Sequence, residues 1–201
     1  GNWLVLSSAN YFLEDAKDLC EIQGWYYQCK GINSVPLKLL LALNNWEHWR
    51  KGELLNHLEI KNIYEYLGDN VLVGFQKGKT LHSDAKYTLK ECQEQHGLLV
   101  STVWYESFNG LDPMTETYIR NMRANGETLN KNPRIKMSTI HAAKGGEADN
   151  VLLMQDLTGA ALETFSHDPD ELHRLFYTGA TRAKRELHVL DPKNFDRAYI
   201  I

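Results

Sequence analysis

The chain has 201 residues, and its composition, 43% hydrophobic and 24% charged, is ordinary for a globular protein. Its formal net charge is −4. Autonomous nucleic-acid binders are usually basic, because their affinity comes largely from neutralising phosphates. The charge therefore argues against strong DNA binding by this chain alone, although it allows one wall of a shared groove. No apolar run approaches the roughly 20 residues that span a bilayer, so we expect no membrane interaction.

The three cysteines are Cys20, Cys29 and Cys92. Their number is odd and no C-x-x-C pair occurs, which favours reduced thiols in a cytoplasmic protein. The eight histidines lack the spacing of zinc ligands, so we expect no metal held by this chain. The chain begins Gly1-Asn2 without an initiator Met and shows no signal peptide. We expect a monomeric part of a larger cytoplasmic protein.

The first third of the chain predicts alternating strands and helices. Trp3–Leu6 is a continuous apolar run, typical of a strand buried on both faces. A helical pattern follows and ends at Gly24, and Trp25–Cys29 predicts a second strand. Pro36 then begins another helix. This order is typical of a parallel α/β sheet, and we assign residues 1–52 to its first part.

Helical patterns dominate the middle of the chain. Ser83–His96 predicts a helix that Gly97 ends, and Asp112-Pro113 predicts the start of another, which Gly126 ends. Leu98–Tyr105 fits a strand or a buried helix, and periodicity does not decide between them. We therefore predict a mainly helical insertion over residues 53–132.

The α/β pattern returns over residues 133–201, which we assign to the second part of the sheet domain. Strands are predicted at Ile135–Ile140, Val151–Met154 and Leu187–Leu190. Between the last two, Asp168-Pro169 places a capping carboxylate before a first-turn proline, a strong signal for the start of a helix.

A polar segment, Ser138–Asp149, begins at the end of the predicted strand Ile135–Ile140 and continues beyond it. Open α/β sheets bind ligands at the carboxyl ends of their strands. The segment offers two glycines, a hydroxyl, an imidazole, an ammonium and a carboxylate, which together suit a polyanion with a sugar hydroxyl. The alternative interpretation is a polar surface turn.

A second segment, Glu171–Lys184, predicts a helix that ends near Gly179 and presents Thr181 and Arg182. An arginine fixed just past a packed helix is well placed to bind a phosphate with two parallel hydrogen bonds. The alternative is a solvated basic helix end that the helix dipole favours.

Taken together, the two segments read T-x-H-x-x-K-G-x-E followed by Y-x-x-x-T-R-A, and they resemble motifs V and VI of UvrD/Rep-type superfamily 1 DNA helicases. The start of the chain, through Trp25-Tyr26-Tyr27, resembles the strand–helix–strand that follows motif IV in that family. The resemblance implies a second RecA-like domain, a P-loop-NTPase-type parallel sheet flanked by helices. It also implies ATP and Mg²⁺ as cofactors, with single-stranded DNA and the N-terminal RecA-like domain as partners. That N-terminal domain would supply the P-loop and hold most of the Mg²⁺ ligands.

The resemblance also implies roles for individual residues. Arg182 matches the arginine finger, the catalytic group that neutralises charge on the γ-phosphate. The other implied ATP-binding residues are Gly145, Glu147 and Tyr177, with Arg174 in support, and the implied DNA-binding residues are Thr139, His141 and Lys144. Two features depart from the family: Gly146 stands where an apolar residue is usual, and the insertion is short.

Two alternative functions stay open at this point. Gly78-Lys79-Thr80 ends like a P-loop, which would make the chain a self-contained NTPase, but Val73 occupies the position that requires a glycine. A non-catalytic single-strand-binding or interaction module is the other alternative. Its base-stacking candidates are Trp46, Trp49, Trp104 and Tyr105. We favour the helicase half and expect no ATP hydrolysis by this chain alone.

Overall fold

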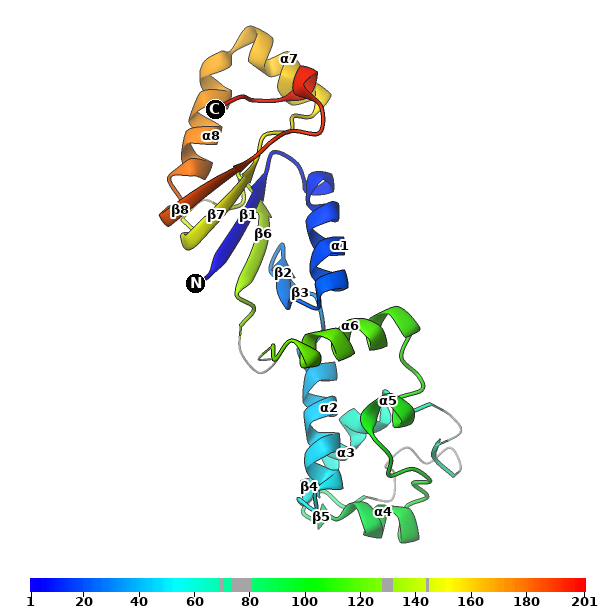
Figure 1. Ribbon diagram of the computed structural model, residues 1–201. Helices are drawn as coiled ribbons and strands as arrows, with labels where there is room; N and C mark the ends of the chain where they lie inside the picture. Colours follow the sequence, from blue (N-terminus) through cyan, green and yellow to red (C-terminus); the bar gives the residue numbers. More distant parts are fainter. Residues whose placement is uncertain (69–70, 74–80, 128–131, 144) are drawn as a thin grey trace. The chain divides into compact units, whose positions relative to one another are not determined.

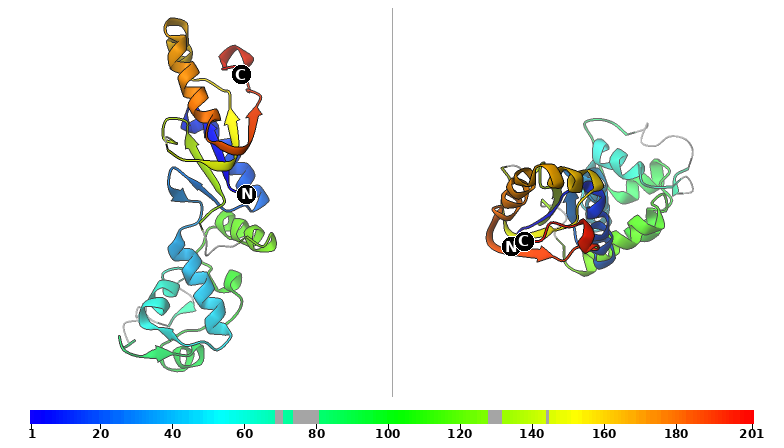
Figure 2. Two further views of the ribbon diagram at one scale, coloured as in Figure 1. Left: turned by 90° about the vertical axis from the view of Figure 1, so that its left-hand side faces the viewer. Right: turned by 90° about the horizontal axis from the view of Figure 1, so that it is seen from above.

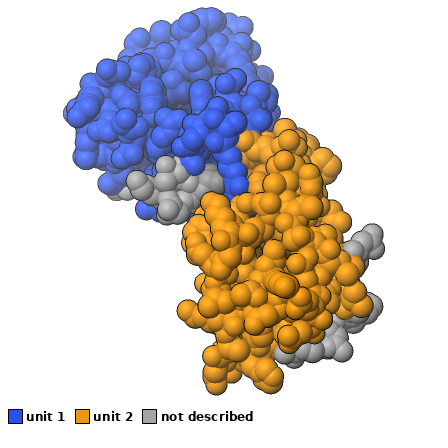
Figure 3. Space-filling view, turned by 60° about the horizontal axis from the view of Figure 1, so that its bottom comes forward, with its two compact units in different colours: residues 1–34, 121–201 blue, residues 35–120 orange. Residues whose placement is uncertain are grey.

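The computed structural model describes residues 1–68, 71–73, 81–127, 132–143 and 145–201. Contacts between Cα atoms divide the chain into two compact units, which Figure 3 colours separately. Unit 1 comprises residues 1–34 and 121–201, and unit 2 comprises residues 35–120. The domain boundaries that we predicted after residues 52 and 132 remain a prediction.

Unit 1 contains the sheet (Figure 1). Its elements are β1 (Trp3–Ser7), η1 (Asn10–Leu13), α1 (Glu14–Gln23), β2 (Tyr27–Cys29), β3 (Ile32–Asn33), β6 (Ile135–Thr139), β7 (Ala148–Met154), α7 (Gly159–His167), α8 (Pro169–Ala180), β8 (Ala183–Leu190) and η3 (Phe195–Arg197). Within the described residues the strand order is β3-β2-β6-β1-β7-β8. Every neighbouring pair is parallel except β2 and β3. This mostly parallel sheet flanked by helices confirms the predicted α/β, RecA-like fold class.

The two faces of the sheet are covered by different helices (Figures 1 and 2). Alternate residues of a strand point to opposite faces. Leu4 and Leu6 of β1 join a buried cluster with Leu172 and Phe176 of α8. Val5, between them, lines a pocket with residues of α1. The sheet is therefore buried on both faces in its centre, as the continuous apolar run predicted.

Local signals in unit 1 behave as the sequence predicted, with small shifts. Gly24 adopts the left-handed conformation (φ 65°) at the end of α1. Asp168 caps α8 by accepting a hydrogen bond from the Glu171 backbone N–H. The strand predicted at Leu187–Leu190 begins earlier, at Ala183, because it continues the parallel pairing with β7. The helix predicted to end near Gly179 continues to Ala180.

Unit 2 is mainly helical. Its elements are α2 (Leu37–Arg50), β4 (Leu55–Asn56), α3 (His57–Tyr64), β5 (Lys86–Tyr87), α4 (Leu89–Gln95) and α5 (Trp104–Ser107), and α6 (Pro113–Ala124) begins in this unit. Trp46, Trp49 and Trp104 are buried in its core. Two of the indole N–H groups, those of Trp46 and Trp49, donate to backbone carbonyls. These three rings therefore serve packing and are inaccessible to nucleic-acid bases.

Two predicted elements of the insertion are corrected by the structure. The helix predicted at Ser83–His96 begins only at Leu89, because Thr88 and Glu91 form a capping box there and Lys86–Tyr87 pairs with β4 instead. The segment Leu98–Tyr105 is neither one strand nor one helix, since Leu98 makes an isolated bridge with Leu72 and α5 begins at Trp104. The Gly78-Lys79-Thr80 sequence lies outside the described residues.

No helix among the described residues is long and apolar enough to span a membrane. No group of three or more His, Cys, Asp or Glu side chains is placed to hold a metal ion in that part of the chain.

Candidate functional site

The polar loop, residues 139–147, connects β6 to β7 and crosses the carboxyl end of β1, which lies between those strands. Backbone hydrogen bonds hold it in a tight turn. The Ile140 N–H donates to the Ser7 carbonyl of β1 (2.9 Å), the Ala143 N–H donates to the Thr139 carbonyl (3.0 Å), and the Gly146 N–H donates to the Ala143 carbonyl (2.8 Å). The loop is therefore anchored to the sheet at its start and closed on itself.

Gly145 has a positive φ of 85°, which side chains rarely adopt. A Cβ built on it would meet no atom within 4 Å. Glycine is therefore favoured here by the backbone conformation and not by a lack of space. Glu147 follows and is exposed. Its carboxylate pairs with the Lys184 ammonium at 3.3 Å, and both side chains are about half exposed, at 52% and 56%. An exposed pair of this kind is worth at most about 1 kcal/mol and opens readily.

The last turn of α8 packs against the sheet through Gly179. A Cβ at this position would lie 3.1 Å from Leu153 Cδ1 and 3.3 Å from Ile140 Cγ2, closer than ordinary contact. Both neighbours are fully buried, one in β7 and the other in the polar loop. The sequence predicted that the helix ends near Gly179, and α8 ends one residue later, at Ala180. In addition, the absence of a side chain at Gly179 lets the helix approach the loop.

The two predicted motifs meet through backbone atoms. The Ala148 N–H donates to the Arg182 carbonyl at 3.1 Å, so residue 182 lies beside the residue that follows Glu147. The Arg182 guanidinium is anchored by its Nε, which donates to the Thr178 carbonyl at 2.9 Å, and Nη2 lies 3.4 Å from the Thr181 hydroxyl. Among the described residues no carboxylate forms an ion pair with it, so its charge stays available.

Tyr177 lies elsewhere on α8. It is 72% exposed and lines a shallow pocket of about 500 Å³ with His173, Arg174 and Tyr199. The Tyr199 hydroxyl lies 2.6 Å from His173 Nδ1. None of the lining residues comes from the polar loop. The structure therefore brings Gly145, Glu147 and Arg182 into one region and does not place Tyr177 with them, and their ATP-binding roles remain predictions.

Of the predicted DNA-binding residues, Thr139 is half-buried and its hydroxyl accepts from the Ala142 N–H at 3.3 Å. His141 is exposed. Lys144 lies outside the described residues. Thr139 also lines a pocket of about 420 Å³ beside the loop. The residues that line it are Leu4, Asn10, Gln28, Lys30, Gly31, Lys136, Met137, Ser138, Thr139, Ala142, Ala143 and Gly146.

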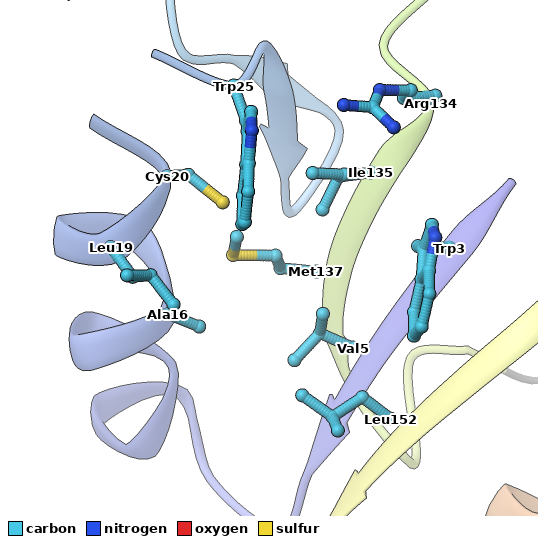
Figure 4. A pocket seen from close by; sticks show the side chains of 10 residues that line it. All are labelled: Trp3, Val5, Ala16, Leu19, Cys20, Trp25, Arg134, Ile135, Met137 and Leu152. Atoms are coloured by element: carbon cyan, nitrogen blue, oxygen red, sulfur yellow. The ribbon is translucent and has the colours of Figure 1, made fainter. Parts of the chain in front are cut away.

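The opposite face of the sheet has a third pocket, of about 370 Å³, between α1 and the strands (Figure 4). Its lining is almost entirely apolar, and Figure 4 shows Trp25, Met137 and Val5 pointing into it. Cys20 lies at its side, and burial raises the pKa of that thiol to about 12. A neutral, desolvated thiol is a poor nucleophile, so this pocket carries no candidate chemistry.

The mostly parallel sheet, its strand order and the flanking helices define an α/β, RecA-like domain. Residues 106–192 match the family model of the UvrD-like helicase C-terminal domain. The match covers the strands β6 to β8, the polar loop and α8. A comparison with curated proteins finds no match. Residues 106–192 are therefore similar to the C-terminal domain of UvrD-like helicases, which confirms the resemblance seen in the motifs.

Proposed function

We propose that this chain completes the ATP site of an ATP-dependent DNA helicase or translocase and supplies part of its single-stranded DNA track. The observation that supports the proposal is the backbone hydrogen bond from Ala148, the residue after Glu147, to the Arg182 carbonyl. The other half of the ATP site would come from the N-terminal RecA-like domain, so the chain alone would not hydrolyse ATP.

Arg182 would act as the arginine finger. Its Nε is engaged with the Thr178 carbonyl, which fixes the plane of the guanidinium and leaves most of its N–H donors for phosphate oxygens. A guanidinium presented to the γ-phosphate stabilises charge that develops during phosphoryl transfer, and such a residue is worth about 10³–10⁵ in rate.

Glu147 would accept a hydrogen bond from the nucleotide ribose once its exposed pair with Lys184 opens. Gly145 would allow the nucleotide to approach the backbone, consistent with the open space beside its Cα. Mg²⁺ would be held mainly by the N-terminal domain and would neutralise phosphate charge when bound. Thr139, His141 and Lys144 would contact phosphates of the single strand.

The decisive experiment is the Arg182→Ala variant of the full-length protein. We expect DNA-stimulated kcat for ATP hydrolysis to fall by about 10³–10⁵, while nucleotide binding changes only a few-fold. Arg185→Ala is the matched control, because Arg185 lies three residues further along, on β8, and its side chain is 77% exposed, with Asp149 3.9 Å away.

A wild-type kcat in Arg182→Ala would exclude the arginine-finger role. A self-contained NTPase would instead lose its activity in Lys79→Ala and would hydrolyse ATP without any other domain. The two variants therefore distinguish this proposal from that alternative.

A further inference from the structure

The pocket of about 420 Å³ beside the polar loop carries a positive charge that nothing in its lining offsets. Lys30 and Lys136 both line it, and none of the described carboxylates does. Within the described residues neither ammonium takes part in an ion pair. Two uncompensated cations in one pocket of a chain whose net charge is −4 indicate a site for an anion.

The two lysines come from segments far apart in the sequence. Lys136 lies on β6, opposite Gln28 of β2 in the parallel register. Lys30 follows β2 directly, and its N–H donates to the Met137 carbonyl of β6 at 3.1 Å. The fold therefore assembles the pocket from the β2–β3 turn and the strand that leads into the polar loop.

Lys30 is held in an unusual conformation. Among the described residues, Lys30 is the one residue other than glycine that has a positive φ, at 52°. Side chains other than Gly, Asn and Asp seldom occupy this region, and strained residues cluster at ligand sites. Gly31, next to it, also has a positive φ, at 79°, so the two residues form the tight turn between β2 and β3, and Lys30 holds its first position.

The strand order indicates which anion the pocket binds. The polar loop starts at β6 and ends at β7, with β1 between them. Glu147 and Arg182 lie at the β7–β8 end of the loop, whereas Thr139 and the two lysines lie at its β6 end. Gly146 also lines the pocket, which therefore extends along the loop towards Glu147, but both lysines lie at the β6 end with Thr139, a predicted DNA contact.

We propose that this pocket binds one phosphodiester group of the single-stranded DNA, with Lys30 and Lys136 as its cationic contacts. This inference rests on the proposed function and extends the DNA track from the polar loop to the β2–β3 turn.

The test is the salt dependence of DNA binding. In the full-length protein without nucleotide, an anisotropy titration of a labelled oligothymidylate from about 50 to 200 mM salt gives the slope of log K against log salt. Each phosphate contact on a single strand contributes about 0.7 to that slope. We expect Lys30→Gln and Lys136→Gln each to lower its magnitude by about 0.7, and the double variant by about 1.4. Lys193→Gln is the control, because the ammonium of Lys193 already pairs with Asp15.

The outcomes distinguish failure of this inference from failure of the proposed function. If wild type and Thr139→Ala differ in DNA affinity but the lysine variants keep the wild-type slope, this inference fails and the proposed function stands. If the lysine variants instead raise the KM for ATP and leave the slope unchanged, the pocket holds nucleotide phosphate and the inference is wrong. If wild type shows no salt-dependent DNA binding, both proposals fail.

Discussion

Gly179 offers the sharpest test of how α8 is positioned. Replacing it with alanine adds one methyl group 3.1 Å from Leu153 Cδ1 and 3.3 Å from Ile140 Cγ2. Carbon atoms in contact normally lie about 3.5–4.0 Å apart, so the neighbours must move by a few tenths of an ångström. Both neighbours are buried and have little room to move.

Two opposing effects determine how much Gly179→Ala changes the free energy of unfolding. Alanine in place of glycine in a helix gains up to about 1 kcal/mol in helix propensity. Overpacking a close-packed core costs about 1–3 kcal/mol. We therefore expect Gly179→Ala to lower the free energy of unfolding by about 0–2 kcal/mol, and Gly179→Val to lower it further. Because Ile140 belongs to the polar loop, the displacement should also reduce ATPase activity.

Gly159→Ala is the matched control. Gly159 begins α7, and a Cβ there would meet nothing within 4 Å, so the substitution should be neutral or stabilising. Urea unfolding of the full-length variants measures the change in the free energy of unfolding for both substitutions. The two values are compared only if the m-values are equal. If Gly179→Ala proves as stable as Gly159→Ala, then residue 179 does not need to be glycine for α8 to pack closely on the loop, and the reasoning is wrong.

Three further predictions follow from single residues. Asp168→Ala should cost about 1 kcal/mol of stability, because the cap of α8 is lost, whereas Asp168→Asn should retain it in the same unfolding assay. Lys30→Gly should leave stability unchanged or raise it by up to about 1 kcal/mol, as backbone strain is relieved, while DNA affinity falls; a clear loss of stability would contradict the strain argument. Burial raises the pKa of Cys20 from 9.0 to about 12, so the unfolded thiol ionises first and stability should decline as the pH rises above about 9, a decline that Cys20→Ala should reduce.

Local chemistry explains why much of the fold could be predicted. The Asp168-Pro169 cap, the glycine at residue 24 and the apolar run of β1 each act over a few residues, and each behaves in the structure as its pattern indicated. The start of α4 was misplaced because a capping box at Thr88 outweighs the helical pattern that precedes it.

The lysine-lined pocket could not be predicted, because it depends on pairing between distant strands. Lys30 and Lys136 become neighbours only through the parallel register of β2 and β6. The dipeptide Lys30-Gly31 is a turn signal, but it does not reveal a charged residue in the left-handed region. The close packing at Gly179 could not be predicted for a similar reason, since its close neighbours come from β7 and the polar loop.

The contact between Ala148 and Arg182 is made by an amide and a carbonyl, so it exists whatever side chains those residues carry, provided that residue 148 is not proline. Architecture and chemistry are thus separable here. Under the role proposed for Arg182, a relative that exchanged the arginine would hydrolyse ATP far more slowly and still preserve every strand and loop. Family membership alone is therefore a poor guide to whether such a domain is an active motor or an inert remnant.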